Sequence, residues 1–359
     1  MSLLILDRRT FLAGAGAAWA SALLPSNAMA LAKDDVLFAS AFMGKDETYG
    51  FALTNAAGDI ISKQKLPDRG HSFAAGGPDG KAVIFARRPG TFALAFDPKM
   101  SSEPVLFSSP DDSHFYGHGL FSPDGTLLYA TENAFKSGDG IIGIYDVAAG
   151  FKRIGAFASG GIDPHDMVLM ADGKTLCVAN GGILTHPNSG RQKLNLDTMK
   201  SVICFIDLKS GTLLESHELP ASLQRLSLRH MAADSAGAIW IGGQYEGDVA
   251  NRPPLIARVG LGQNLIMPEF APDITNAFSN YVGSVSASAD GTRIAFTSPV
   301  GGAMLIIDAK TAAPIETKTI TKVCGVAASG ADFLISTETG LLGGKQHDEH
   351  WDNHIKQVV

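Results

Sequence analysis

The chain has 359 residues, of which 45% are hydrophobic and 18% are charged, so it can bury a large core and is not intrinsically disordered. Its 36 acidic residues outnumber its 29 basic residues, which leaves a net charge of −7. That charge creates no field to attract nucleic acid or an anionic membrane, and both are excluded as working partners. The 40 glycines and 17 prolines are typical of many short strands joined by tight turns.

The first thirty residues predict an export signal. Residues 7–12 (Asp-Arg-Arg-Thr-Phe-Leu) match the twin-arginine consensus, and Ala28-Met29-Ala30 forms an Ala-x-Ala cleavage site. The apolar run between them has about fourteen residues, whereas a membrane span needs roughly 20. We therefore expect a twin-arginine signal peptide at 1–30, cleavage after Ala30 or Ala32, and one exported domain at 31–359. The mature protein is then periplasmic in a Gram-negative source, with no membrane insertion.

Cysteine usage does not support a disulfide framework. The chain has three cysteines, Cys177, Cys204 and Cys324, which is an odd and small number for an exported protein held by disulfides. We expect Cys177 and Cys204 to be buried thiols on neighbouring strands of the core.

A repeat of about 47 residues organises the rest of the chain. Each unit reads as a small-residue strand, an Asp-Gly type hairpin turn, a fully apolar strand, a third strand that usually ends in Asp, and a more polar fourth strand. Four units begin at a histidine, and these are His71, His118, His165 and His230. Two later units begin without one, at Val282 and at Cys324.

This repeat predicts an all-β fold, a seven-bladed β-propeller. Four strands at this period are typical of a propeller blade with four antiparallel strands, and about 330 residues at about 47 per unit make seven blades. An α/β fold is disfavoured because the chain has no amphipathic helical pattern of useful length.

The ring is expected to be closed by strands from both ends of the chain. Residues 36–65 supply only the second, third and fourth strands of a blade. The tail at 351–359 can supply the missing inner strand, which leaves no exposed sheet edge. This pairing places His354 where the other blades have their histidines. A frayed polar tail is the alternative.

The inner strands of a propeller line its central channel, so the repeat brings the histidines around one channel mouth. The candidate metal ligands are His71, His118, His165, His230, His354 and Cys324. The candidate ligand-binding residues, from the ends of second strands and from the start of one inner strand, are Arg87, Glu132, Asn180, Gln244 and Tyr281. Repeated histidines can equally be structural, because an imidazole can hydrogen-bond the backbone of the next blade.

Imidazole, carboxylate and thiolate donors suit iron, copper or zinc rather than magnesium or calcium. Arg87 would repel a bare metal and favours an anionic ligand or a metal–anion complex. Because a channel ring spreads its members, we expect only two or three direct ligands, with His118 and His165 the most favourable pair. The tail at 347–354 also combines metal-ligand residue types at short spacing, or forms a solvated turn.

Motifs along the whole mature chain carry a family resemblance. They include Gly-His-Ser-Phe-Ala (70–74), Tyr-Gly-His-Gly-Leu-Phe-Ser-Pro-Asp-Gly (116–125), Pro-His-Asp (164–166), Asn-Gly-Gly-Ile-Leu-Thr-His-Pro (180–187), Arg-His-Met (229–231), Asn-Tyr-Val-Gly-Ser-Val (280–285) and Trp-Asp-Asn-His (351–354). Together they resemble the exported propeller family called domain of unknown function 1513. The resemblance implies a fold like YVTN and quinoprotein amine dehydrogenase propellers, and it supplies no catalytic residues. It also implies periplasmic partners of imelysin or di-haem oxidoreductase type, which are associated with iron handling.

These observations favour a binding module that holds a metal ion or small anion at the channel mouth and assists iron or metal handling. The histidines are plentiful, and the sequence contains no recognisable nucleophile–base–orienter set. Two alternatives stay open. One is a propeller enzyme, a lyase or oxidoreductase that uses histidine and Glu132 as acid and base. The other is an interaction scaffold whose histidines are structural.

Overall fold

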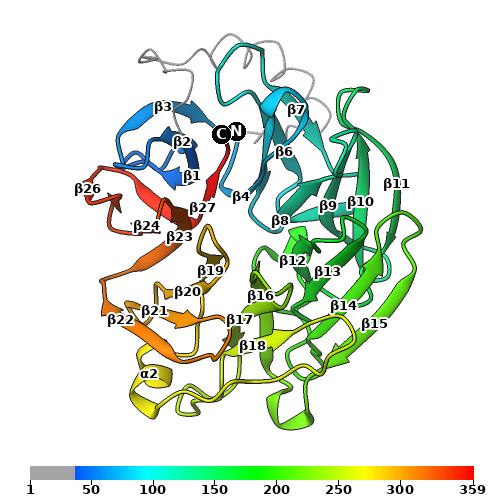
Figure 1. The fold of residues 1–359 in the computed structure, drawn as a ribbon. Coiled ribbons are helices and arrows are strands. Elements are labelled where there is room, and N and C mark those ends of the chain that lie inside the picture. Colours follow the sequence, from blue (N-terminus) through cyan, green and yellow to red (C-terminus); the bar gives the residue numbers. More distant parts are fainter. Residues whose placement is uncertain (1–36) are drawn as a thin grey trace, which may run out of the picture.

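The computed structural model describes residues 37–359, and the expected signal peptide with its cleavage sites lies outside that range. Seven β-sheets stand around a central axis as the blades of a propeller (Figure 1), which confirms the predicted all-β architecture. Within residues 37–359 the only α-helix is the short α2 (Pro272–Ala277), and no helix is long and apolar enough to cross a membrane.

Every blade starts with an inner strand next to the axis, followed by its second strand. The inner strands are β4 (Gly70–Ala74), β8 (Ser113–Phe121), β12 (Pro164–Leu169), β16 (Leu226–Ala233), β19 (Ser284–Ala287), β23 (Val323–Ser329) and β27 (His350–Gln357). The second strands are β1 (Phe38–Met43), β5 (Ala82–Ala86), β9 (Leu127–Ala134), β13 (Thr175–Asn180), β17 (Ile239–Tyr245), β20 (Arg293–Ser298) and β24 (Asp332–Thr337).

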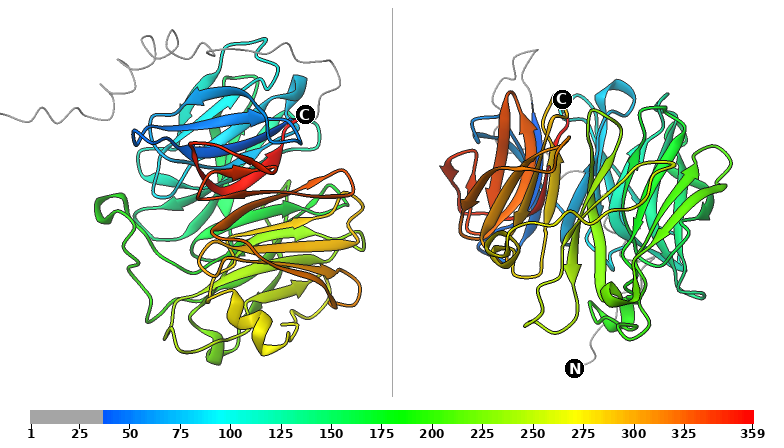
Figure 2. Two further views of the ribbon diagram at one scale, coloured as in Figure 1. Left: turned by 90° about the vertical axis from the view of Figure 1, so that its left-hand side faces the viewer. Right: turned by 60° about the horizontal axis from the view of Figure 1, so that its bottom comes forward.

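The third strands, and the fourth strands where a blade has one, form the outer part of the blades (Figure 1), and Figure 2 shows the ring from two further sides. The third strands are β2 (Tyr49–Thr54), β6 (Phe92–Phe96), β10 (Gly140–Asp146), β14 (Val202–Asp207), β18 (Ile256–Val259), β21 (Ala303–Asp308) and β25 (Leu341–Leu342). The fourth strands are β3 (Ile60–Lys65), β7 (Val105–Ser108), β11 (Lys152–Ala158), β15 (Leu213–Glu218), β22 (Pro314–Thr319) and β26 (Lys345–Gln346). Six blades thus have four strands, and the blade β16-β17-β18 has three. A single bridge from Arg258 to Ile266 stands where its fourth strand would pair.

The ring closes between the two ends of the chain, as predicted. β27 pairs antiparallel with β1, from Phe38 opposite Gln357 to Met43 opposite His350, and the sheet order is β27-β1-β2-β3. In Figure 1 the red C-terminal strand lies between the blue N-terminal strands and the axis. The tail is therefore an integral inner strand and not a frayed end.

The turns explain the recurring sequence pattern. In the hairpin from β8 to β9, Asp124 accepts hydrogen bonds from the Ser122 hydroxyl at 2.6 Å and from the Thr126 amide at 3.0 Å. The same turn recurs around Asp290 in the hairpin from β19 to β20. The aspartates at the ends of third strands also accept hydrogen bonds from the turn that follows. Asp207, for example, accepts from the Ser210 amide at 2.7 Å. Short polar side chains that bond their own turn favour tight hairpins over helix.

Apolar second strands pack blade against blade. All residues of β5 and β13 are buried, because both faces of these strands meet neighbouring sheets. Aromatic rings meet across the interfaces, as Phe85 and Phe115 do at a centroid distance of 5.5 Å. The buried thiols Cys177 and Cys204 lie on the paired strands β13 and β14, as expected, and burial raises the pKa of Cys204 to about 11.

Candidate metal centre in the central channel

Five histidines from five inner strands converge on the propeller axis. Each exposes 9% of its surface or less, and they are His71, His118, His165, His230 and His354. The ring centroids of His71 and His354 are 4.5 Å apart, and those of His71 and His230 are 6.4 Å apart. The histidines therefore contact one another across the channel instead of surrounding an open mouth. The expectation that the ring spreads its members is wrong.

Irregular strand pairing directs these side chains to the axis. The regular register breaks between Gly70 and Phe73 in β4, and it breaks between Pro164 and Asp166 in β12. Similar breaks lie at the histidines of β8, β16 and β27. A bulge adds local twist and re-aims a side chain, so five bulges turn five imidazoles inward.

Close packing at the cluster also requires a glycine. Gly117 precedes His118 in β8 and has a φ of +105°, a conformation that a side chain rarely adopts. A Cβ at this position would lie 2.7 Å from Cδ2 of His71. The glycine therefore lets the backbone of β8 approach the imidazole of the preceding blade.

Three buried or half-buried carboxylates orient three of the imidazoles. The Nδ1 atom of His71 lies 2.9 Å from the Asp352 carboxylate, and the Nδ1 atom of His118 lies 3.0 Å from the Asp166 carboxylate. In His165 the corresponding distance to Asp163 is 3.4 Å. A carboxylate accepts the Nδ1–H proton, which leaves the lone pair of Nε2 free on the opposite side of the ring.

The five histidines form two overlapping triads. The donor atoms of His71, His118 and His165 lie within 4.8 Å of one another, and so do those of His118, His230 and His354. In the second triad, Nε2 of His118, Nδ1 of His230 and Nε2 of His354 are buried without any hydrogen-bond partner. A buried polar atom without a partner costs about 1–3 kcal/mol, so three such atoms in one triad make it a candidate ligand site.

Four of the imidazoles, those of His71, His165, His230 and His354, are held in the neutral form. Burial lowers the pKa of His71 to about 3, although its bond to Asp352 works in the other direction. Burial, together with the neighbouring histidines and arginines, lowers the pKa values of His165, His230 and His354 well below the usual range. Neutral imidazole is the form that binds metal ions, so no proton has to leave these rings at neutral pH.

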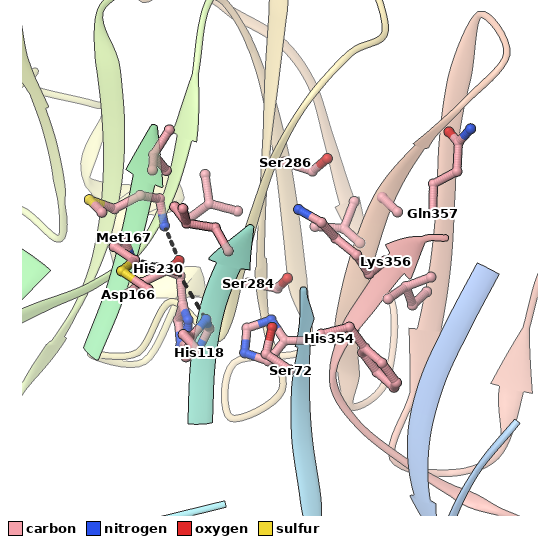
Figure 3. A pocket seen from close by; sticks show the side chains of 18 of the residues that line it. Ser72, His118, Asp166, Met167, His230, Ser284, Ser286, His354, Lys356 and Gln357 are labelled. Carbon is pink, nitrogen blue, oxygen red and sulfur yellow. Dashed lines mark hydrogen bonds and ion pairs between the residues drawn. The ribbon is translucent and has the colours of Figure 1, made fainter. Parts of the chain in front are cut away.

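A cavity of about 390 Å³ leads to the cluster from one face of the propeller. Figure 3 shows His118, His230 and His354 side by side at one end of it, with Asp166 bonded to His118. The cavity wall continues towards the C-terminal ends of the inner strands, through Lys356 and Gln357 of β27. A metal ion or small molecule could reach the second triad by this route.

A second, narrower cavity lies at the starts of the inner strands, and it also touches the cluster. Its lining consists of His71, Arg87, Arg88, His165, Arg191, Arg229, His230, Tyr281 and Asn353. Arg87 and Tyr281 thus lie beside the histidines, where the sequence analysis expected them. Arg87 donates to Asp352 at 2.9 Å, and the Tyr281 hydroxyl accepts from Asn353 at 2.7 Å.

Cys324 does not join the cluster, and its assignment as a metal ligand has to be corrected. Its Sγ lies 3.5 Å from the Ser336 hydroxyl and 3.6 Å from the Trp351 carbonyl, within the apolar contact between two blades. Burial raises the pKa of this thiol to about 12, so it stays protonated and is a poor metal ligand. The repeat predicts its strand correctly but not the direction of its side chain.

Glu132 is also directed away from the axis. In β9 the preceding residue, Thr131, contacts the backbone of His118, and successive side chains of a strand face opposite ways. The Glu132 carboxylate therefore accepts from Tyr145 at 2.6 Å and from Arg153 at 2.9 Å inside its own blade. It is fully used there, and the expected acid–base pair with a histidine is not assembled.

Asn180 and Gln244 have structural positions as well. The Asn180 amide donates to the Ser159 carbonyl at 2.9 Å and accepts from the Ser159 hydroxyl at 2.6 Å. Gln244 pairs through its backbone with Ser227 and Tyr281 at a blade junction. Neither residue is among those that line the two cavities in the described part of the chain.

Several site residues were missed from the sequence. Asp163 and Asp352 each precede a histidine by two residues, so a shared Asp-x-His spacing in two blades was a usable signal. Of the tail histidines, only His354 joins the cluster, because the imidazole of His347 lies 2.9 Å from the Gly58 carbonyl and that of His350 lies 2.8 Å from the Glu338 carbonyl. The missed basic residues are Arg88, Arg191 and Arg229, two of which directly adjoin residues already singled out.

Comparison with known proteins identifies the family. Residues 64–358 match the model of the family described as "Protein of unknown function (DUF1513)". The chain belongs to this family. No curated protein matches it by sequence.

Solved structures similar to this DUF1513 chain share its fold. Kuenenia stuttgartiensis hydrazine synthase aligns with a TM-score of 0.61 and 14% identity, over 83% of this chain and 89% of that chain. The β-propeller domain of Myceliophteria thermophila Cps50 (Swd1) aligns with a TM-score of 0.58 and 10% identity, over 87% and 95%. At these identities the likeness concerns the propeller architecture alone.

Proposed function

We propose that this DUF1513 protein is an exported metal-binding propeller that holds one transition-metal ion in the histidine cluster, as an accessory of periplasmic metal handling. The observation that supports it most is the second triad, where each of three imidazoles keeps one buried nitrogen without a partner and the donor atoms lie within 4.8 Å of one another. Histidines that only held blades together would bond the neighbouring backbone with these nitrogens.

The donor set favours zinc, copper or iron. Imidazole suits these borderline metals, and the thiol of Cys324, which would favour softer ions, points elsewhere. Zn–N bonds of about 2.0–2.1 Å place tetrahedral donors about 3.4 Å apart. Because the donor atoms of each triad lie within 4.8 Å of one another, the imidazoles would have to draw inward by no more than about 1 Å on binding. The carboxylates behind His71 and His118 would hold these rings in register.

Metal titration of the mature protein tests this proposal. Chelator-treated protein without a histidine tag is expected to bind about one equivalent of Zn(II), Cu(II) or Fe(II), measured by competition with a chromophoric chelator. His118→Ala should lower the affinity at least 100-fold, because His118 belongs to both triads. His217→Ala is the matched control, since His217 lies on β15 beside Glu215, outside the cluster. If wild-type protein binds none of the three metals, or if both variants bind equally well, the proposed site is wrong.

A second variant tests the carboxylate that orients His118. Asp166→Asn keeps the size of the side chain but removes the charge that accepts the Nδ1 proton at 3.0 Å. Loss of such a partner typically costs 10–100-fold in metal affinity, and we expect a decrease of that size. Unchanged affinity in a folded Asp166→Asn protein would show that this contact does not support metal binding.

The export part of the proposal rests on the arginine pair. Replacing Arg8 and Arg9 with lysine is expected to leave unprocessed precursor in the cytoplasm, detected by fractionation and immunoblotting. Normal periplasmic accumulation of this variant would argue for another export route. We extend the proposal to partners of imelysin or di-haem oxidoreductase type, which co-purification from the periplasm can test.

A further inference from the structure

The second cavity is surrounded by more arginine side chains than carboxylates. Arg69, Arg87, Arg88, Arg191 and Arg229 gather around it. Within residues 37–359 the carboxylates that lie within 4.0 Å of these guanidinium groups are Asp163, Asp352 and Glu246, and Glu338 acts on Arg87 from a greater distance. Arg69 and Arg87 share Asp352, and Arg88 pairs with Asp163 at 3.1 Å. These pairs hold the carboxylates behind His71 and His165 and are structural.

Two arginines, Arg191 and Arg229, have donor groups that no carboxylate accepts from within residues 37–359. Arg229 is 4% exposed, and its Nη2 is buried without a hydrogen-bond partner, with Glu246 3.7 Å away and too far to accept from it. Arg191 lies on the exposed loop between β13 and β14 and makes no ion pair within residues 37–359. Desolvation, followed by the charges of Arg87 and Arg88, lowers the pKa of Arg191 to about 10. Guanidinium groups are therefore crowded together here with donors to spare.

We propose that this arginine cavity binds a small oxyanion, an inorganic oxyanion or the carboxylate group of an organic acid. A buried guanidinium with a free donor is matched by charged oxygen acceptors, which form its strongest hydrogen bonds. Arg229 would hold the inner oxygen and Arg191 would close over the outer ones. The whole cavity has a volume of only about 10 Å³, which admits about one oxygen atom, so the rest of the anion would lie outside it, towards Arg191. Tyr281 and Asn353 add polar groups at the same wall.

An anion in this cavity would also change the affinity of the cluster for metal, an inference that rests on the proposed function. His71, His165 and His230 line this cavity and also belong to the metal triads. The wide channel cavity reaches the same cluster through His118, His230 and His354. An oxyanion in the arginine cavity would thus neutralise charge directly beside the metal, so the anion and the metal should each raise the affinity for the other by the same factor.

Anion binding to metal-free protein tests the inference separately from the metal proposal. Chelator-treated wild-type protein in low-chloride buffer is titrated calorimetrically with sulfate and phosphate in one arm, and with acetate and citrate in the other. We expect binding with a Kd of about 1 mM or tighter in at least one arm. Binding in the first arm alone identifies an inorganic oxyanion, and binding in the second alone identifies a carboxylate ligand. Either result supports the site.

Substitutions then locate the binding. Arg191→Gln should weaken it at least about 10-fold, since a charge-assisted hydrogen bond is lost from an exposed side chain that folding does not need. Arg225→Gln removes the same charge from an exposed arginine paired with Asp197, and it should leave binding unchanged. Arg229→Lys keeps the buried charge, and its folded fraction is checked by circular dichroism.

The outcomes separate the two proposals. Failure of every anion to bind, or equal affinity of Arg191→Gln and Arg225→Gln, overturns the oxyanion site even if zinc binds normally. Arginine-dependent anion binding in a protein that takes up no metal would support the oxyanion site and reject the proposed function. Repeating the Zn(II) titration with and without saturating sulfate measures the coupling.

Discussion

Trp351→Ala is expected to lower the free energy of unfolding by about 3–5 kcal/mol, the usual cost of deleting a large buried aromatic side chain. Trp351 is 1% exposed, its ring meets Phe42 edge-on at 5.9 Å, and its indole N–H donates to the Gly340 carbonyl at 3.1 Å. The substitution opens a cavity and also leaves that buried carbonyl without its indole partner. It does so in β27, the strand that closes the ring.

Chemical denaturation measures this effect when it is followed by far-UV circular dichroism, a signal that does not depend on the replaced tryptophan. Leu214→Ala is a suitable control, because Leu214 on β15 is 51% exposed and its truncation should change stability by no more than about 0.5 kcal/mol. Deletion of residues 351–359 should leave β1 without its inner partner and produce an aggregating protein. An unfolding transition of the deletion variant at the wild-type denaturant concentration would show that the propeller closes without the tail.

Metal-free protein is expected to lose stability steeply as the pH falls from about 7 to 5. In the folded state burial holds the pKa of His71 at about 3 and those of His165, His230 and His354 well below the usual range. In the unfolded chain histidine titrates near 6.5, so below that pH the unfolded state binds more protons. Stability is therefore complete above about pH 7 and falls with pH, by about 2 kcal/mol per histidine at pH 5.

Four such groups together are comparable to the whole stability of a typical domain, about 5–15 kcal/mol. Denaturation midpoints at pH 7, 6 and 5 in the presence of a chelator measure the slope. His230→Gln, which removes one buried titrating group, should make the slope shallower. Equal stability at pH 7 and pH 5 would mean that the folded protein accepts protons on the cluster, against the neutral form described above.

The blades were predictable because their signals are local. A Ser-x-Asp-x-Thr turn such as the one at Asp124 bonds itself, and an all-apolar strand such as β5 needs cover on both faces. Repetition at about 47 residues then set the number of blades. Even the closing strand followed from counting, because residues 36–65 lacked an inner strand and 351–359 was the piece left over.

The composition of the site depended on side-chain direction and on distant contacts. Successive residues of a strand point to opposite faces of the sheet. Thr131 therefore contacts His118, whereas the next residue, Glu132, forms its hydrogen bonds inside its own blade. Register breaks aim the five histidines inward, and no local pattern distinguished these breaks from regular strands. Asp352 meets His71 across 281 residues of sequence, which only ring closure brings together. The repeat thus identified the five histidines, whereas the packing of seven blades around one axis determined which carboxylates and arginines accompany them.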